Sequence, residues 1–148
     1  MSKKKNKAKQ LIRVILDTNI LVSSLMSSEG NPAKIVTLVR MNKLQLYYNT
    51  EILNECNRVL RYPRLQIMPH EISIIVGLLS RKGIVMEAVK SDIKMLDESD
   101  RVFYDLHKTA MAILITGNAR HYPSESTIMT PVDFLTKYFP EHVVKPKG

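Results

Sequence analysis

Apolar and polar positions along the chain predict strands and helices in turn. Residues 11–16 are nearly all apolar or β-branched, and the run stops at Asp17, which is typical of a strand buried on both faces. Asn31 is placed to cap the next helix, with Pro32 at its first position and apolar residues at mostly helical spacing until about Asn42. This part of the chain therefore predicts a strand followed by a helix.

The middle of the chain continues the same order. Residues 44–48 indicate a short second strand, after which Thr50 is placed to cap an amphipathic helix that ends before Pro63. A further amphipathic helix fits residues 69–80, and a brief strand fits residues 84–86.

The last third predicts a helix over residues 97–108, strands at 112–115 and 128–129, and a capped closing helix from Thr130 to about Tyr138. Strands that alternate with helices imply right-handed crossovers, and hence an α/β fold of three layers in which helices flank a mostly parallel sheet. Ligand sites in such sheets form beyond the carboxyl ends of the strands.

The length of 148 residues fits one domain with its own core, which we place at residues 11–140. The formal net charge is +8, but five lysines lie within the first nine residues, so the rest of the chain carries only +3. We expect residues 1–10 to form a disordered basic tail, which could attract polyanions weakly or keep the protein soluble. Residues 141–148 are expected to form a short C-terminal tail.

Several classes of protein are excluded by what the sequence lacks. The glycines form neither a G-x-G-x-x-G turn nor a Walker loop, so any phosphate chemistry must use side chains and metal. The single Cys56 excludes an internal disulfide and a cysteine-based zinc site, and it fits a cytoplasmic location. Arg13 and Asp17 interrupt the apolar run after the basic tail, so we expect neither export nor membrane insertion.

Polar residues at the predicted strand ends suggest a site. Asp17 follows the most buried strand, where a carboxylate is costly unless it is paired or holds a cation. The alternative is that Asp17 only caps a helix starting near Ile20. Asp100 and residues 116–118 lie at the ends of predicted helices or strands. The parallel topology of the sheet brings these ends to the same edge as Asp17. Crowded carboxylates either bind protons or are neutralised by a divalent cation, and Mg²⁺ or Mn²⁺ suits oxygen ligands.

These residues resemble a known family. Residues 12–19, I-R-V-I-L-D-T-N, followed by L-V-S at 21–23, are similar to the opening of PIN-domain nucleases. Later stretches agree in order and spacing, namely residues 50–60 with an internal Glu, D-E-S-D-R-V-F-Y at 97–104, L-I-T-G-N at 114–118 and M-T-P-V-D-F-L at 129–135. The pattern, which covers roughly residues 11–139, is similar to the PIN subfamily described as toxin components of toxin–antitoxin systems.

The resemblance implies a ribonuclease that hydrolyses RNA with water activated on Mg²⁺ or Mn²⁺. It places Asp17, Glu55 and Asp100 as the metal-binding and catalytic acids, with Asn19 as a polar neighbour of Asp17. Glu51 competes with Glu55 from one turn earlier on the same helix face, although an acid in a first turn commonly just complements the helix dipole.

Three further residues are expected to support this site. The three-residue spacing of Asp97 and Asp100 could be explained by helix capping alone. Capping and metal binding are compatible if Asp97 caps the helix while Asp100 faces the metal. Thr116 and Asn118 match the small polar residues after the fourth strand. Many relatives carry a fourth acid at or near Asn118, and an amide supplies no negative charge there, so a second metal is expected to bind weakly.

The resemblance also implies partners: RNA, a cognate antitoxin protein and often a second copy of the chain in a homodimer. Basic residues on the helices could line an RNA path or be ordinary solvated side chains; they are Arg58, Arg61, Arg64, Arg81 and Lys82. The alternative function is a catalytically weak or inactive PIN-fold module that binds RNA or a protein partner.

Overall fold

The computed structural model describes residues 10–145, so the predicted basic tail, except Gln10, and the last three residues of the predicted C-terminal tail lie outside it. Within these described residues, five strands form one sheet in the order β3-β2-β1-β4-β5, and every pairing is parallel. Their bounds are β1 (Ile12–Leu16), β2 (Leu44–Tyr48), β3 (Gly83–Val85), β4 (Ile113–Ile115) and β5 (Ile128–Met129).

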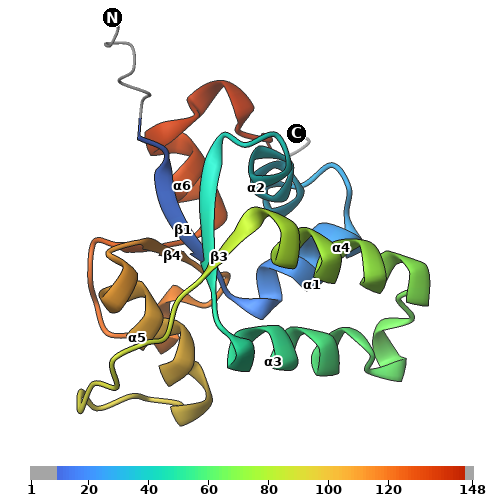
Figure 1. The fold of residues 1–148 in the computed structure, drawn as a ribbon. Helices are drawn as coiled ribbons and strands as arrows, with labels where there is room; N and C mark the ends of the chain where they lie inside the picture. The colour runs from blue at the N-terminus through green and yellow to red at the C-terminus, as the bar shows by residue number, and fades with distance from the viewer. Residues whose placement is uncertain (1–9, 146–148) are drawn as a thin grey trace, which may run out of the picture.

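In the part of the chain that the structure describes, six helices connect and cover the strands. They are α1 (Thr18–Met26), α2 (Asn31–Arg40), α3 (Thr50–Leu60), α4 (Pro69–Lys82), α5 (Arg101–Ala110) and α6 (Pro131–Tyr138). Short 3₁₀ turns occur at η2 (Pro63–Leu65), η3 (Glu98–Asp100), η4 (Ala119–His121) and η5 (Pro140–His142). Figure 1 shows α1, α2 and α4 on one side of the sheet and α5 on the other. The predicted three-layer α/β fold is confirmed.

Two predicted helix caps are wrong by one residue. The N-cap of α3 is Asn49, not Thr50, and the Asn49 side chain accepts a hydrogen bond from the Ile52 N–H at 2.9 Å. Asparagine is as good a cap as threonine, and Asn49 stands directly at the end of β2. The N-cap of α2 is Gly30, and the Asn31 amide instead accepts from the N–H of Val144 at 2.7 Å. Asn31 therefore holds the C-terminal segment against the domain.

Several element boundaries differ from the predictions: the helix predicted over residues 97–108 is the turn η3 followed by α5, and two further differences lie where α4 meets β3. Helix α4 runs two residues past the predicted end, to Lys82, and β3 begins one residue early, at Gly83. A Cβ at residue 83 would lie 2.6 Å from the Tyr48 ring and 2.7 Å from the Leu79 carbonyl oxygen. Only glycine lets the chain pass from helix to strand so close to β2.

The core is built around β1, which has a strand on each side. Val14 and Ile15 are fully buried, as are Leu114 and Ile115 of the neighbouring β4. The chain leaves β1 towards β2 and later returns on the opposite side as β4, so the strand order reverses between β1 and β4. Crevices at such reversals are where open α/β sheets bind ligands. Within residues 10–145, every helix is too short or too polar to cross a bilayer.

Candidate functional site

Asp17 is the first residue after β1 and occupies the N-cap position of α1. Its side chain makes no capping hydrogen bond, so the capping alternative does not account for it. Instead Oδ2 accepts hydrogen bonds from the Thr116 hydroxyl at 2.8 Å and the Tyr122 hydroxyl at 2.9 Å. Among the described residues, nothing donates to Oδ1. One oxygen of this buried carboxylate is thus fixed by the protein, and the other is free to bind a cation.

Thr116 connects the ends of β1 and β4. Its buried hydroxyl donates to Asp17, accepts from the Asn118 N–H at 3.0 Å and lies 3.4 Å from Nδ2 of Asn19. These contacts use the one donor and both acceptor positions of a hydroxyl. Asn19 also accepts from the Gly117 N–H at 2.9 Å, so its amide orients the turn after β4, and among the described residues it makes no side-chain hydrogen bond to Asp17.

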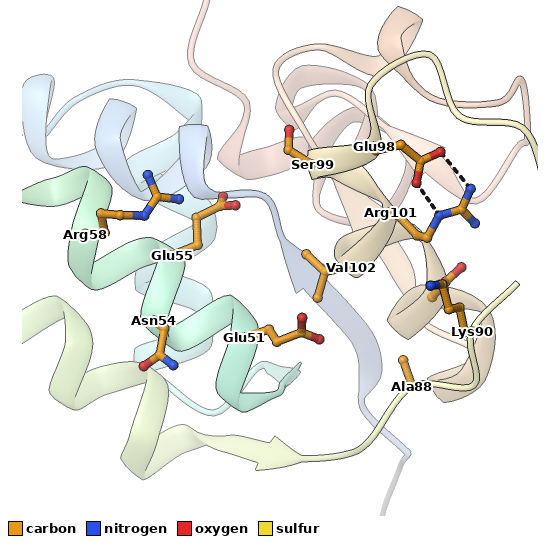
Figure 2. Close-up of a pocket in the computed structure, with 11 residues that line it drawn as sticks. Glu51, Asn54, Glu55, Arg58, Ala88, Lys90, Glu98, Ser99, Arg101 and Val102 are labelled. Carbon is orange, nitrogen blue, oxygen red and sulfur yellow. Dashed lines mark hydrogen bonds and ion pairs between the residues drawn. The ribbon is translucent and has the colours of Figure 1, made fainter.

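Glu55 is half-buried on α3, one turn after the exposed Glu51. Its Oε2 accepts a hydrogen bond of 2.6 Å from the hydroxyl of Thr18, the residue next to Asp17. Figure 2 shows the Glu55 carboxylate beside the segment that joins β1 to α1, with Glu51 farther away in the first turn of α3. The structure therefore ties Glu55, rather than Glu51, to the neighbourhood of Asp17.

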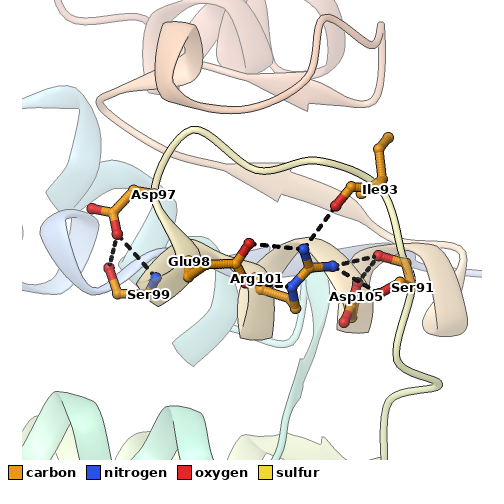
Figure 3. A network of polar contacts seen from close by, with 7 residues as sticks. All are labelled: Ser91, Ile93, Asp97, Glu98, Ser99, Arg101 and Asp105. Carbon is orange, nitrogen blue, oxygen red and sulfur yellow. Dashed lines mark hydrogen bonds and ion pairs between the residues drawn. The ribbon is translucent and has the colours of Figure 1, made fainter.

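Asp97 and Asp100 have different environments on η3. The Asp97 carboxylate accepts from the Ser99 N–H at 2.9 Å and the Ser99 hydroxyl at 2.8 Å, and these bonds lower its pKa (Figure 3). Asp97 is therefore a capping residue. Asp100 makes no capping bond, and partial burial, together with the nearby Asp17, raises its pKa to about 6. Asp97 and Glu55 add to this shift, so Asp100 shares the electrostatic environment of the other acids.

Two residues of the site were missed by sequence reasoning. Tyr122 is buried in the segment after η4, and burial beside Asp17 raises its pKa far above the ordinary value, so the hydroxyl remains a donor. No spacing signal marks Tyr122, because its contact depends on how the segment after β4 folds back. Thr18 could have been noticed, since it stands between two predicted site residues.

Cys56 and His121 lie near the acids but contribute differently. Burial raises the pKa of the Cys56 thiol to about 12, so the thiol is protonated at neutral pH. His121 is exposed, and its positive form helps to hold down the pKa of Asp100. Asn118 is also exposed, with its backbone bound to Thr116.

The donor set fits a hard divalent cation, because Asp17, Glu55 and Asp100 all offer carboxylate oxygens. Across residues 10–145, no three His, Cys, Asp or Glu side chains converge closely enough to enclose an ion. Mg²⁺ is usually held by one or two carboxylates, several waters and substrate phosphates rather than by a complete protein cage. An open arrangement of acids at the edge of the sheet is compatible with that kind of binding.

A cleft of about 700 Å³ opens beside these acids, between α3 and the beginning of α5 (Figure 2). Glu55 lines it from α3, and Ser99, the neighbour of Asp100, lines it from η3. The cleft therefore adjoins the acidic site.

The pattern typical of PIN domains matches residues 13–120, which include Asp17, Glu55 and Asp100. The chain belongs to the PIN domain family. It is also 29% identical over 110 residues to the uncharacterized protein MJ1680 of Methanocaldococcus jannaschii, covering 72% of this chain and 71% of that protein. PIN domains are typically nucleases that use divalent metals. Tyr122 and α6 lie beyond the matched residues.

Proposed function

We propose that this PIN domain is a metal-dependent endoribonuclease in which Asp17, Glu55 and Asp100 bind Mg²⁺ or Mn²⁺. The observation that carries the proposal is the environment of Asp17, whose Oδ2 is held by two hydroxyls while Oδ1 stays open at the reversal of strand order. A carboxylate held in this way is prepared to bind a cation without reorganising. The family membership supports nuclease chemistry at the same edge of the sheet.

The protein's own residues would orient the reaction. Thr116 and Tyr122 fix the direction of the Asp17 carboxylate, and Thr18 fixes Glu55 at 2.6 Å. Asp100 would complete the ligand set, since the negative charges of Asp17 and Glu55 add to the effect of burial in raising its pKa, and a cation would relieve that repulsion. When bound, the ion supplies Lewis acidity, which activates water for attack and stabilises charge on the phosphoryl group.

The second candidate is a catalytically weak or inactive PIN module that binds RNA or a protein partner. Two points favour it: the described acids do not form a closed ion site, and Asn118 supplies no negative charge at or near the position where the family resemblance implies a fourth acid. The two candidates differ in whether a divalent metal is required for RNA degradation.

The finer biological proposal is that the protein is the toxin of a toxin–antitoxin pair and acts on RNA in the cytoplasm. A cognate antitoxin would block the acidic site with Arg or Lys side chains, because cations satisfy carboxylates that lack metal. A homodimer belongs to the same proposal. Co-purification from the native host tests it, and expression with neither growth arrest nor a bound protein would count against it.

The experiment for the enzymatic proposal is metal removal and return. Purified protein is incubated with labelled single-stranded RNA in EDTA, and Mn²⁺ is then added in excess. We expect cleavage only after the addition. Cleavage that persists in EDTA would indicate a contaminating nuclease or another mechanism, and its absence under both conditions would favour the inactive module.

A further inference from the structure

The cleft beside the acids has one wall made by a polar stripe of α3. The residues of this stripe are spaced at i, i+3, i+4 and i+7, so they share one helix face, and they are Glu51, Asn54, Glu55 and Arg58. The opposite face of the helix carries the buried Ile52, Cys56 and Leu60. The stripe is thus a continuous polar surface that leads away from Glu55.

The other wall is formed by the beginning of α5 and by the strap, residues 86–97, which follows β3 and has no regular secondary structure. Arg101 holds the strap in place (Figure 3). Its guanidinium donates to both carboxylate oxygens of Glu98 at 2.7 and 3.0 Å, to the carbonyl and hydroxyl of Ser91 at 2.8 and 3.0 Å, and to the Ile93 carbonyl at 2.7 Å. Since a guanidinium has five N–H groups, Arg101 has none left for a ligand.

Two acids of the cleft are also occupied. Glu98 is paired with Arg101, and Asp105 accepts a hydrogen bond from the Ser91 hydroxyl at 2.5 Å. Arg58 uses one N–H, which donates to the Tyr62 hydroxyl at 2.6 Å. Lys90 is exposed and has no hydrogen bond or ion pair within residues 10–145. Arg58 and Lys90 are thus the two lining cations with free donors, and they come from opposite walls.

We propose that this cleft binds the single-stranded RNA that flanks the cleaved bond, with Arg58 and Lys90 contacting its phosphates. The inference rests on the proposed function for the identity of the polymer. The volume of about 700 Å³ lies in the range of pockets that enclose a small ligand, so it suits one or two nucleotides of a single strand and not a duplex. Because Glu55 and Ser99, the neighbour of Asp100, line the cleft, a strand that leaves the acids can enter it.

The lining also indicates how this RNA is contacted. Its residues include no aromatic side chain, so bases have no ring to stack on. Asn54 and Ser99 offer hydrogen bonds, while Arg58 and Lys90 offer charge. Binding in the cleft therefore depends on the phosphate backbone and on salt, with a weak preference for sequence.

The test uses the full chain with Asp17→Asn, which blocks cleavage, and a short labelled oligouridine whose binding is followed by fluorescence anisotropy. Adding Arg58→Gln or Lys90→Gln is expected to weaken binding about fivefold at 0.1 M salt and to reduce the salt slope by about 0.7, the contribution of one phosphate contact to a single strand. Lys137→Gln removes the same charge from the exposed face of α6 and is expected to leave the affinity unchanged.

Arg58→Lys keeps the charge and should retain most of the binding, and thermal unfolding verifies that each variant is folded. If both cleft variants bind like Lys137→Gln, or if duplex RNA binds as tightly as the single strand, the proposal is wrong. The cleft proposal and the enzymatic proposal can each fail independently of the other. Arg58→Gln and Lys90→Gln are also made in the chain that keeps Asp17, so that cleavage can be measured. Metal-dependent cleavage with an unchanged KM in both of these variants would retain the nuclease and refute the cleft, whereas selective loss of binding without any wild-type cleavage would retain the cleft and refute the nuclease.

Discussion

The Tyr122 hydroxyl donates a hydrogen bond of 2.9 Å to the Asp17 carboxylate across 105 positions of sequence. It shares Oδ2 with the Thr116 hydroxyl, so the two donors bind the same oxygen and leave Oδ1 without a donor among residues 10–145. This arrangement leaves Oδ1 as the oxygen of Asp17 that can bind a cation.

Tyr122→Phe is expected to reduce metal-dependent RNA cleavage on the order of 10-fold, because outer hydrogen bonds that orient a metal ligand have effects of that size. The ring and its packing remain, and the loss of one hydrogen bond should change the free energy of unfolding by about 1 kcal/mol. Initial cleavage rates at saturating Mn²⁺ and a thermal melt measure the two effects. Unaltered cleavage at all Mn²⁺ concentrations would show that Tyr122 does not position Asp17.

Asp100→Asn is expected to stabilise the metal-free protein at pH 7.5 while it abolishes cleavage. The Asp100 pKa is raised to about 6 in the folded protein, so the folded state binds more protons than the unfolded state between the ordinary value of 3.8 and about 6. Stability is therefore lost as the pH rises through this window, and the amide avoids that loss.

The gain for Asp100→Asn should be about 1 kcal/mol or less, because the side chain is partly exposed and solvent screens its neighbours. Urea unfolding in EDTA at pH 4 and pH 7.5 measures it, with Asp133→Asn on the exposed face of α6 as the matched control. A variant that is less stable than wild type at pH 7.5 would contradict the account in which burial and the neighbouring acids raise the Asp100 pKa.

His107 should make the fold sensitive to acid. Burial lowers its pKa below the ordinary 6.5, and its ring nitrogens contact the Tyr104 carbonyl at 2.7 Å and the Thr127 hydroxyl at 3.1 Å. The unfolded state then binds more protons below pH 6.5, so stability decreases as the pH falls through that value. His107→Gln is expected to flatten the pH dependence of the free energy of unfolding between pH 7.5 and 5, while the control His142→Gln at an exposed position should not. Equal slopes of unfolding free energy against pH for both variants would exclude His107 as the source.

Asn118→Asp is expected to strengthen Mn²⁺ binding. Two unit charges about 4 Å apart interact by about 4 kcal/mol at an effective dielectric near 20, and a third of that energy already corresponds to about a tenfold change in affinity. Calorimetry without RNA should show at most one tight site in the wild type and tighter binding in the variant, with Asn118→Ala as the uncharged control. Two tight wild-type sites, or no gain with Asp, would mean that Asn118 is not the position of the missing acid.

The sequence predicted the parts of this molecule that depend on local pattern. The buried run before Asp17 identified β1, and the Pro131 helix with its Thr130 cap was correct because the Thr130 hydroxyl accepts from the Asp133 N–H at 3.2 Å. Helix caps next to strand ends were harder to predict from the sequence. Asn49 and Thr50 are both suitable cap residues, and the direction in which the chain leaves β2 decides between them.

Contacts between distant segments could not be predicted in the same way. Tyr122 reaches Asp17, and Arg101 reaches the carbonyls of Ser91 and Ile93, only because the segments around η4 and the strap fold back over the domain. No periodicity encodes such contacts. The family resemblance indicated Glu55, and its hydrogen bond from Thr18 gives the physical reason to prefer it over Glu51.

The most direct test of the central claim compares Asp17→Asn with Asp133→Asn in Mn²⁺-dependent cleavage of single-stranded RNA. Both variants remove one carboxylate without changing the size of the side chain, but only Asp17 lies at the carboxyl end of β1 with an open Oδ1. We expect Asp17→Asn to fold and to lose cleavage while Asp133→Asn cleaves like the wild type. Equal cleavage by folded Asp17→Asn and wild-type protein would contradict the account.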